Sequence, residues 1–222
     1  MSNTHMNQVK AVLFDLDGTL LDTAPDMGAA LNAVLREEGR PPVGPEVAKS
    51  FSSHGSRGLL EYAYAAEFHA RREELRDKFL RYYAANIAAD TQLYNGISQL
   101  LAQLSANGIA TAIVTNKPQA MTEQLMPYFP ELAALPVRVS GDTLAVAKPH
   151  PDPILYAAEQ LAIDPTHCWY VGDAERDIQA GRAAGMKTVL ARYGYIAAHE
   201  QPEHWGADYS IEHPLQLLEL LR

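Results

Sequence analysis

The chain has 222 residues, of which 47% are hydrophobic, and a formal net charge of -9. This length is sufficient for one sizeable core, or for one core with a small inserted domain. Because the charge is acidic and no basic residues cluster, we expect neither nucleic acid nor an anionic membrane surface as a partner. The single cysteine, Cys168, cannot form an internal disulfide and is predicted to be a buried core residue. No secretory segment or apolar run of membrane-spanning length is found, so a reducing, cytoplasmic setting is the expectation.

The apolar run from Ala11 to Phe14 predicts a buried strand, and Asp15 and Asp17 follow it at a turn that Gly18 allows. Carboxylates at the carboxyl end of a buried parallel strand lie where open α/β sheets bind their ligands. The pattern indicates phosphoryl transfer, in which Asp15 attacks phosphorus and Asp17 acts as general acid and then as general base. Two carboxylates repel an anionic phosphate, so this chemistry requires a divalent cation. An acidic turn without a chemical role is the alternative interpretation.

The interval from residue 24 to residue 88 is predicted to be helical throughout. Pro25 suits the first turn of a helix that Thr23 would cap, and Gly39 ends the apolar periodicity of that helix. Further helices are predicted from Pro45, over 59–68 and over 72–89. Nothing in this interval has the pattern of a core strand, so an all-helical block separates the first strand from the rest of the chain.

From Gly96 onward, predicted strands alternate with predicted helices. The strands cover residues 110–114, 137–139, 167–171 and 188–191, with a last edge strand over 207–211. The helices cover residues 97–106, 119–128, 154–161, the segment that ends near 184, and 214–221. Asp152 is expected to cap the third of these helices. Such alternation predicts βαβ units and a parallel sheet, so the expected fold class is α/β.

Two residues near predicted element ends suit a phosphate ligand. Thr115 follows a strand and offers a hydroxyl group to a phosphate oxygen, although a threonine in this position also commonly caps the next helix. Lys148 lies in a proline-rich loop and would neutralise both the phosphate and the Asp15 nucleophile. The alternative for Lys148 is a solvated surface lysine, which is the commoner case.

A second pair of aspartates follows the predicted strand 167–171. Asp173 comes directly after Val171 and Gly172 and is a candidate metal ligand through a hard oxygen. Asp177 lies one helical turn further on the same face, where it could be a second ligand or could orient one. The alternative is an acidic cluster that complements a helix dipole. The order of these residues, each at the end of its own element, argues against coincidence.

The motifs collected in this way are Asp15-Leu16-Asp17-Gly18-Thr19, Thr115-Asn116-Lys117, Lys148-Pro149, and Gly172-Asp173 with Asp177. Together they resemble the four motifs of the haloacid dehalogenase superfamily, and the resemblance covers essentially the whole chain. It implies a Rossmann-like core domain over residues 1–22 and 90–222, with a helical cap domain over 23–89 inserted after the first strand. This cap coincides with the helical block that the periodicity predicts.

The resemblance also implies a role for each matching residue. Asp15 takes the position of the nucleophile, and Asp17 that of the general acid and base. Thr115, Asn116 and Lys148 take the phosphate-binding positions.

Magnesium is the cofactor that the resemblance implies. It would be held by Asp15, the backbone carbonyl of Asp17, and Asp173. Asp177 would orient these ligands without binding the metal itself. Ala174 departs from the serine or threonine that is common after the metal-binding aspartate, which removes one helix-cap hydrogen bond but leaves the metal-binding carboxylate.

Within the superfamily, the chain is similar to phosphoglycolate phosphatases. The matching segments are 20–26, 115–118, 148–153 and 192–195. The segments 193–196, 205–208 and 213–215 are instead similar to the N-acetylmuramic acid 6-phosphate phosphatases of cell-wall recycling. We therefore expect a small phosphorylated metabolite as substrate, 2-phosphoglycolate with N-acetylmuramic acid 6-phosphate as the alternative, and a monomer or homodimer.

Substrate selectivity is expected in the cap, because the core binds only the phosphate that all substrates share. The loop over 53–57 is the candidate, with His54 and Arg57 facing the substrate. Arg57 could pair bidentately with a carboxylate, which both substrates carry. The alternative is an exposed loop in which the arginine caps a helix.

Four rival functions stand beside this interpretation. A haloacid dehalogenase also uses an aspartate nucleophile, but Asp17 argues against that branch, which lacks the acid/base aspartate. A sugar phosphomutase shares all four core motifs and stays open. A phosphonate hydrolase needs a cap lysine for a Schiff base, and neither Lys49 nor Lys78 has a convincing setting. A non-catalytic phospho-aspartate module is disfavoured by the helical insertion and by the intact aspartate pair.

Overall fold

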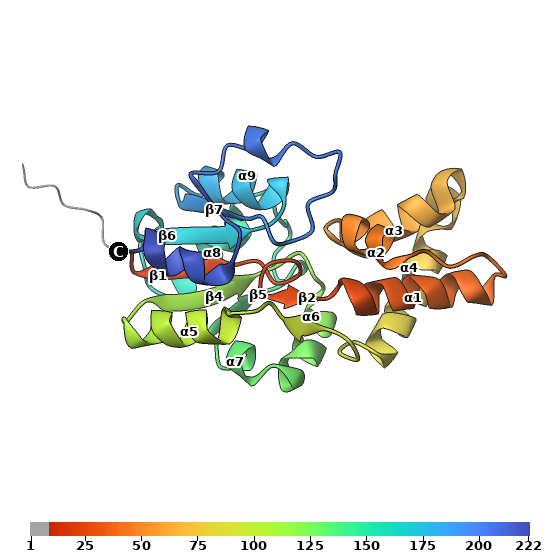
Figure 1. Cartoon of the computed structure of the whole chain (residues 1–222), viewed down its shortest axis with the longest axis horizontal. Coiled ribbons are helices and arrows are strands. Elements are labelled where there is room, and N and C mark those ends of the chain that lie inside the picture. The colour runs from red at the N-terminus through yellow and green to blue at the C-terminus, as the bar shows by residue number, and fades with distance from the viewer. Residues whose placement is uncertain (1–8) are drawn as a thin grey trace, which may run out of the picture.

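The computed structural model describes residues 9–222, and its largest element is a six-stranded sheet (Figure 1). The strands follow the order β5-β4-β1-β6-β7-β8, and every neighbouring pair is parallel. Their bounds are β1 Ala11–Phe14, β4 Ala110–Val114, β5 Val137–Val139, β6 Cys168–Gly172, β7 Lys187–Ala191 and β8 Tyr209–Ile211. The α/β class and the parallel sheet predicted from the sequence are confirmed. Because β1 is flanked by β4 and β6, the residues that follow it lie at the middle of the sheet edge.

Helices cover both faces of this sheet. Accordingly, alternate residues of β1 pack into two separate apolar clusters, one on each face. Val12 and Phe14 belong to one cluster, which includes Leu104 of α5. Ala11 and Leu13 belong to the other, which includes residues of α8 and α9. The helices of this part are α5 Ile97–Ala106, α6 Gln119–Leu125, α7 Pro130–Ala133, α8 Asp152–Gln160, α9 Glu175–Ala183 and α10 Leu217–Leu220. Burial on both faces explains the continuous apolar run of β1 in the sequence.

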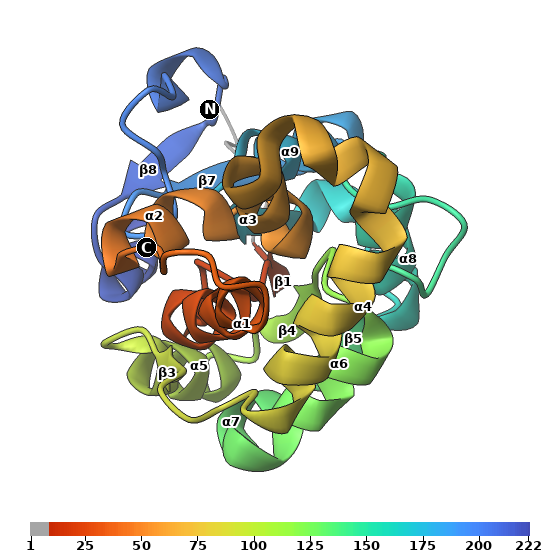
Figure 2. The ribbon, with the colours of Figure 1, turned by 90° about the vertical axis from the view of Figure 1, so that its right-hand side faces the viewer.

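A separate group of helices lies in front of the sheet when the molecule is viewed as in Figure 2. These helices are α1 Ala24–Glu37, α2 Pro45–Ser52, α3 Gly55–Tyr64 and α4 Phe68–Ala85. They pack on one another through buried apolar side chains, among them Leu31, Leu60 and Phe79. All four helices fall within the interval that the sequence resemblance assigns to a cap domain, and we call them the cap. None of the helices within residues 9–222 combines the length and the apolar character needed to cross a bilayer.

Two chain segments connect the cap to the rest of the molecule, and they run side by side. The short strands β2, Leu21–Asp22, and β3, Gln92–Leu93, pair in antiparallel fashion. The buried carboxylate of Asp26 accepts hydrogen bonds from the N–H groups of Asp90 and Thr91, at 3.0 and 2.8 Å, and from the Thr91 hydroxyl at 2.6 Å. The connection is therefore a hydrogen-bonded double strand, which was not predicted because two-residue strands leave no periodic signal.

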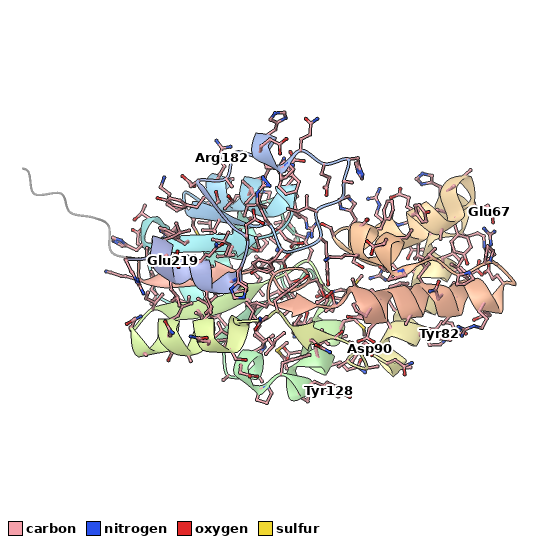
Figure 3. The ribbon with its side chains drawn as sticks, viewed as in Figure 1. Glu67, Tyr82, Asp90, Tyr128, Arg182 and Glu219 are labelled. Atoms are coloured by element: carbon pink, nitrogen blue, oxygen red, sulfur yellow. The ribbon has the colours of Figure 1, made fainter. Side chains whose placement is uncertain are left out.

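Charged side chains link α1 to α4 on the outer part of the cap. Glu38, at the end of α1, accepts hydrogen bonds from Arg71 and Lys78 of α4. These bonds, with that from Arg71 the strongest influence, lower the pKa of Glu38 to about 2. Arg71 also reaches Glu67, which Figure 3 places at the far end of the cap. The network fastens the two longest cap helices together at a distance from the sheet.

Three sequence expectations about helix ends change in detail. Thr23 does precede α1, but its hydroxyl donates to Asp17 at 2.6 Å and does not cap the helix, because a charged acceptor makes the stronger bond. Asp152 is the first residue of α8, and Pro151 occupies the capping position. The last predicted helix is divided into a 3₁₀ turn over Pro214–Gln216 and the short α10. Cys168 is buried in β6, as expected.

Candidate active site

The aspartate that follows β1 is enclosed and charged. The Asp15 Oδ1 atom accepts the N–H of Leu16 at 2.7 Å and lies 2.9 Å from the Lys148 Nζ atom. Burial favours the neutral acid, but the positive charges of Lys148 and Arg176 overcome it and hold the pKa of Asp15 below its ordinary value. Asp15 is therefore ionised, as a nucleophile must be.

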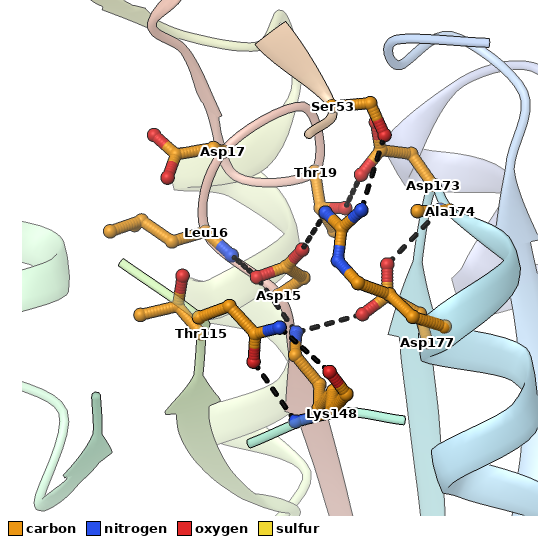
Figure 4. A network of polar contacts seen from close by, with 12 residues as sticks. Asp15, Leu16, Asp17, Thr19, Ser53, Thr115, Lys148, Asp173, Ala174 and Asp177 are labelled. Carbon is orange, nitrogen blue, oxygen red and sulfur yellow. Dashed lines mark hydrogen bonds and ion pairs between the residues drawn. The ribbon is translucent and has the colours of Figure 1, made fainter. Parts of the chain in front are cut away.

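Lys148 lies behind Asp15, with its side chain 0% exposed. Its ammonium group contacts Asp15, the Asp177 Oδ1 atom at 2.7 Å, the Val114 carbonyl at 2.7 Å and the Tyr170 hydroxyl at 2.7 Å. Figure 4 shows the contacts of Lys148 with Asp15 and Asp177. An ammonium group has three donors, so these four contacts use its whole capacity. In this structure the positive charge of Lys148 therefore lies against the carboxylates of Asp15 and Asp177.

Asn116 is bound to the backbone of Lys148 on both sides of its amide. Its Nδ2 group donates to the Lys148 carbonyl at 2.8 Å, and its Oδ1 atom accepts the Lys148 N–H at 3.0 Å. The side chain thereby fixes the loop that carries the lysine. Thr115, which follows β4, is buried, and its hydroxyl accepts the N–H of Lys117 at 3.1 Å.

Asp15, Asp173 and Asp177 form a buried carboxylate cluster, in which one oxygen of each lies within 4.8 Å of the others. Asp173 accepts hydrogen bonds from the Thr19 hydroxyl at 3.2 Å and from the Tyr195 N–H at 2.7 Å. Burial and the charges of the two other aspartates raise the pKa of Asp173 to about 8. This excess of negative charge on hard oxygen atoms fits a divalent cation such as magnesium.

Gly18 allows the backbone to pass directly against this cluster. Its φ is +83°, and a Cβ atom there would lie 2.1 Å from the Asp173 Oδ2 atom. Gly194 closes the cluster from another side, since a Cβ atom at that position would lie 2.3 Å from the Asp173 Cβ atom. Neither position has room for a side chain, so both glycines preserve the space around the carboxylate.

The carboxylate of Asp177 is bonded within the protein through both oxygen atoms. The Oδ2 atom accepts the N–H of Ala174 at 3.0 Å, and the Oδ1 atom contacts Lys148. Asp177 thus caps the first turn of α9, where Ala174 has no hydroxyl group to do so. Of the two roles open for Asp177, these contacts favour the one that orients its neighbours over direct metal ligation.

Asp17 faces away from Asp15 and has partners of its own (Figure 4). Besides the Thr23 hydroxyl, it contacts the Lys117 Nζ atom through both oxygens, at 2.9 and 3.2 Å. Lys117 is buried under the ring of Tyr83 from α4, and the charge of Asp17 raises the pKa of Lys117 in spite of burial. Sequence reasoning gave Lys117 no role, although it is the third residue of the threonine motif.

A cavity of about 540 Å³ separates these residues from the cap. From the sheet side Asp15, Asp17 and Thr115 line it, and from the cap His54 and Arg57 do so. Burial and the nearby charge of an arginine lower the pKa of His54. Arg57 is 65% exposed, and its only ion pair among the described residues is with Glu61 at 3.4 Å. The structure therefore brings the predicted cap residues to the cavity that contains the two catalytic candidates.

Besides Lys117, two further residues of the site were missed by sequence reasoning. Arg176, between the two aspartates of the last motif, lines the cavity near Asp15. The hydroxyl of Tyr195 accepts the N–H groups of Thr23 and Ala24, at 2.5 and 2.8 Å, so this tyrosine ties the start of α1 to Asp173. The position of Arg176 within the motif was one available signal, and Tyr195 lies in the segment 192–195, whose resemblance to phosphoglycolate phosphatases gave it no individual role.

Comparisons with known proteins extend over nearly the whole chain. A model of the haloacid dehalogenase-like hydrolase family matches residues 12–191. The phosphoglycolate phosphatase of Xanthomonas campestris pv. campestris (strain 8004) is 45% identical over 210 residues, which cover 95% of each chain. The N-acetylmuramic acid 6-phosphate phosphatase of Pseudomonas aeruginosa is 40% identical over 215 residues, which cover 96% of this chain and 95% of that one.

The same likeness is seen among solved structures. A crystal structure described as a predicted phosphoglycolate phosphatase from Haemophilus somnus 129pt matches with a TM-score of 0.86 and 26% sequence identity. The match covers 98% of this chain and 100% of that one. Sheet and cap are therefore both included in the similarity.

Proposed function

This chain belongs to the haloacid dehalogenase-like hydrolases and is a phosphomonoester hydrolase, and from that premise we propose a mechanism, a metal and a substrate class. The proposal is that it hydrolyses a small phosphorylated carboxylic acid, with magnesium, through an aspartyl-phosphate intermediate. One observation carries it: an ionised, buried Asp15 lies at the floor of the cavity between the sheet and the cap, against Lys148 and two further carboxylates.

In the first step, an oxygen of Asp15 attacks phosphorus and the bond from phosphorus to the ester oxygen breaks. Lys148 and the Leu16 N–H hold the attacking carboxylate in one orientation, so little rotation is lost on reaction. Asp17 gives a proton to the departing oxygen. For this its side chain must exchange Thr23 and Lys117 for the substrate.

In the second step, water attacks phosphorus and the bond from phosphorus to Asp15 breaks, which restores the free carboxylate. Asp17 takes the proton of this water and so returns to its protonated state for the next cycle. Asp15, the backbone carbonyl of Asp17, and Asp173 would hold magnesium, which supplies positive charge against the phosphate oxygens. Thr115 would donate its hydroxyl to one of these oxygens.

The substrate we propose is 2-phosphoglycolate, in line with the relative at 45% identity. N-acetylmuramic acid 6-phosphate is a second candidate, and two observations favour it: the relative at 40% identity, and a cavity of about 540 Å³, which is more room than a two-carbon acid needs. Both molecules carry a carboxylate that Arg57 could bind across the cavity. A single assay separates them.

That assay measures phosphate release from both esters side by side, with and without magnesium, and with Asp15→Asn as the blank. We expect magnesium-dependent release from at least one ester and none from the blank. A higher kcat/KM for 2-phosphoglycolate supports the first substrate, and a higher value for the muramic acid ester supports the second. If neither ester is hydrolysed above the blank, the substrate proposal is wrong.

A further inference from the structure

Arg176 stands between the nucleophile and the cap. Its backbone belongs to the first turn of α9, but its side chain extends into the cavity and is 20% exposed. The Nη2 atom lies 3.9 Å from the Asp15 Oδ2 atom, and the Nη1 group donates to the Ser53 hydroxyl at 3.4 Å. Ser53 directly follows α2, so the guanidinium group lies between Asp15 and the substrate-facing loop of the cap.

The donors of Arg176 are largely uncommitted. A guanidinium group has five N–H donors in a planar fork, and the bond to Ser53 is the only hydrogen bond it makes to the described residues. The separation of 3.9 Å from Asp15 is too long for a hydrogen bond. Lys148 presents the opposite case, because its ammonium group is enclosed and its donors are already used.

Other cations line the cavity, but their positions differ. Lys117 is held by both oxygens of Asp17. Arg57 and Arg76 belong to the cap. Among the residues described, neither of them forms an ion pair with Asp15, which requires a nitrogen–oxygen distance of 4.0 Å or less. A phosphate that approaches Asp15 closely enough to react comes within reach of the Arg176 fork on the same side.

We propose that Arg176 binds the phosphate group of the substrate bidentately, and that Lys148 serves mainly to charge and orient Asp15. This inference rests on the proposed function, since it assigns a residue to the phosphate of that reaction. Arginine suits the task because its fork matches two phosphate oxygens at once. The bond to Ser53 makes the cap loop part of the phosphate site, so the cap must be closed for the arginine to be correctly placed.

The test uses inorganic phosphate, which carries the proposed contact and none of the rest of the substrate. Its inhibition constant is measured for the wild type, Arg176→Ala and Arg176→Lys, and its dissociation constant is measured by calorimetry in the presence of magnesium. Arg182→Ala is the matched control, because Arg182 is an exposed arginine of the same helix (Figure 3).

We expect Arg176→Ala to weaken phosphate binding by about 10- to 100-fold, as for the loss of charge-assisted hydrogen bonds. Arg176→Lys keeps the charge but not the fork and should fall between. The KM for the ester should rise in parallel, and Arg182→Ala should bind phosphate as the wild type does. A purely structural role of Arg176 instead predicts a lower melting temperature with an unchanged phosphate constant, and that result would overturn the inference.

A second variant guards against misfolding, and two separate measurements distinguish failure of this inference from failure of the proposed function. If Arg176→Ala does not fold, Arg176→Gln removes the charge while it retains a polar contact for Ser53, and the same loss is expected. If the wild type releases phosphate but none of the Arg176 variants binds phosphate more weakly, the inference fails and the proposed function stands. If the wild type hydrolyses no phosphomonoester, the proposed function fails, and calorimetry with phosphate still decides the role of Arg176.

Discussion

The two sides of the cavity are built on different principles. On the sheet side, Asp15, Lys148, Asp173 and Asp177 are almost completely buried, and each has at least two polar partners. On the cap side, Arg57 is mostly exposed and has one partner on its own helix. The comparison indicates that the sheet side, which we call the floor, is preorganised, and that the cap side, which we call the roof, is adaptable. We therefore expect the floor to act on the phosphate and the roof to contact the rest of the substrate.

The energetics of the two sides differ in the same way. A buried charge that loses its partner costs about 3–5 kcal/mol, so the charges of the floor depend on one another. An exposed ion pair such as that of Arg57 contributes about 0–1 kcal/mol. Changes in the floor should therefore affect the chemical step, and changes in the roof should affect which substrate binds.

The replacement Asp15→Asn should have the largest effect, namely loss of all measurable turnover. The amide has nearly the same shape, but it is not a nucleophile and cannot form the acyl phosphate. Phosphate release in the presence of magnesium is the measurement, and the melting temperature is the control for folding. Activity at the wild-type level would contradict the whole assignment of the floor.

The replacement Asp17→Asn should lower kcat by about 10²- to 10⁴-fold, which is the usual contribution of general acid and base catalysis. The loss should be smaller for an aryl phosphate, because an aryl oxygen leaves without a proton from the enzyme. We would measure kcat for both kinds of ester. An equal loss on the two would show that Asp17 does not protonate the leaving group.

The replacement Asp173→Asn should mainly weaken the response to magnesium. Removal of one carboxylate takes a charged ligand from the cluster but leaves Asp15 and Lys148 in contact. The magnesium concentration for half-maximal activity should rise by about tenfold or more, and excess magnesium should restore part of the activity. An unchanged magnesium requirement would exclude Asp173 as a ligand.

The floor could be predicted from the sequence because its geometry is a property of the sheet. Asp15, Thr115 and Asp173 each follow an apolar run, and the carboxyl ends of adjacent parallel strands meet at one edge. The register places Phe14 beside Ile113 and Val171, so the following residues converge. Local pattern and global fold agree at these positions.

What could not be predicted depends on how the cap lies over the sheet. Arg176 and Lys117 acquire their roles from Ser53 and Tyr83, which belong to distant cap segments. Tyr195 reaches the start of α1 across 172 positions of sequence. No periodicity or motif spacing encodes such contacts, because they arise only when segments that are distant in the sequence meet in the folded chain.

The smallest expected effect lies in the roof. Arg57→Ala should raise KM for a carboxylated substrate by about fivefold, as for the loss of a partly exposed charge pair, and should leave an aryl phosphate without a carboxylate unchanged. Arg72→Ala is the matched control, since Arg72 is an exposed arginine of the cap outside the lining of the cavity. If Arg57→Ala impairs both esters equally, the arginine does not recognise the carboxylate. The roof would then act on the phosphate as the floor does, and the two sides of the cavity would not differ in function.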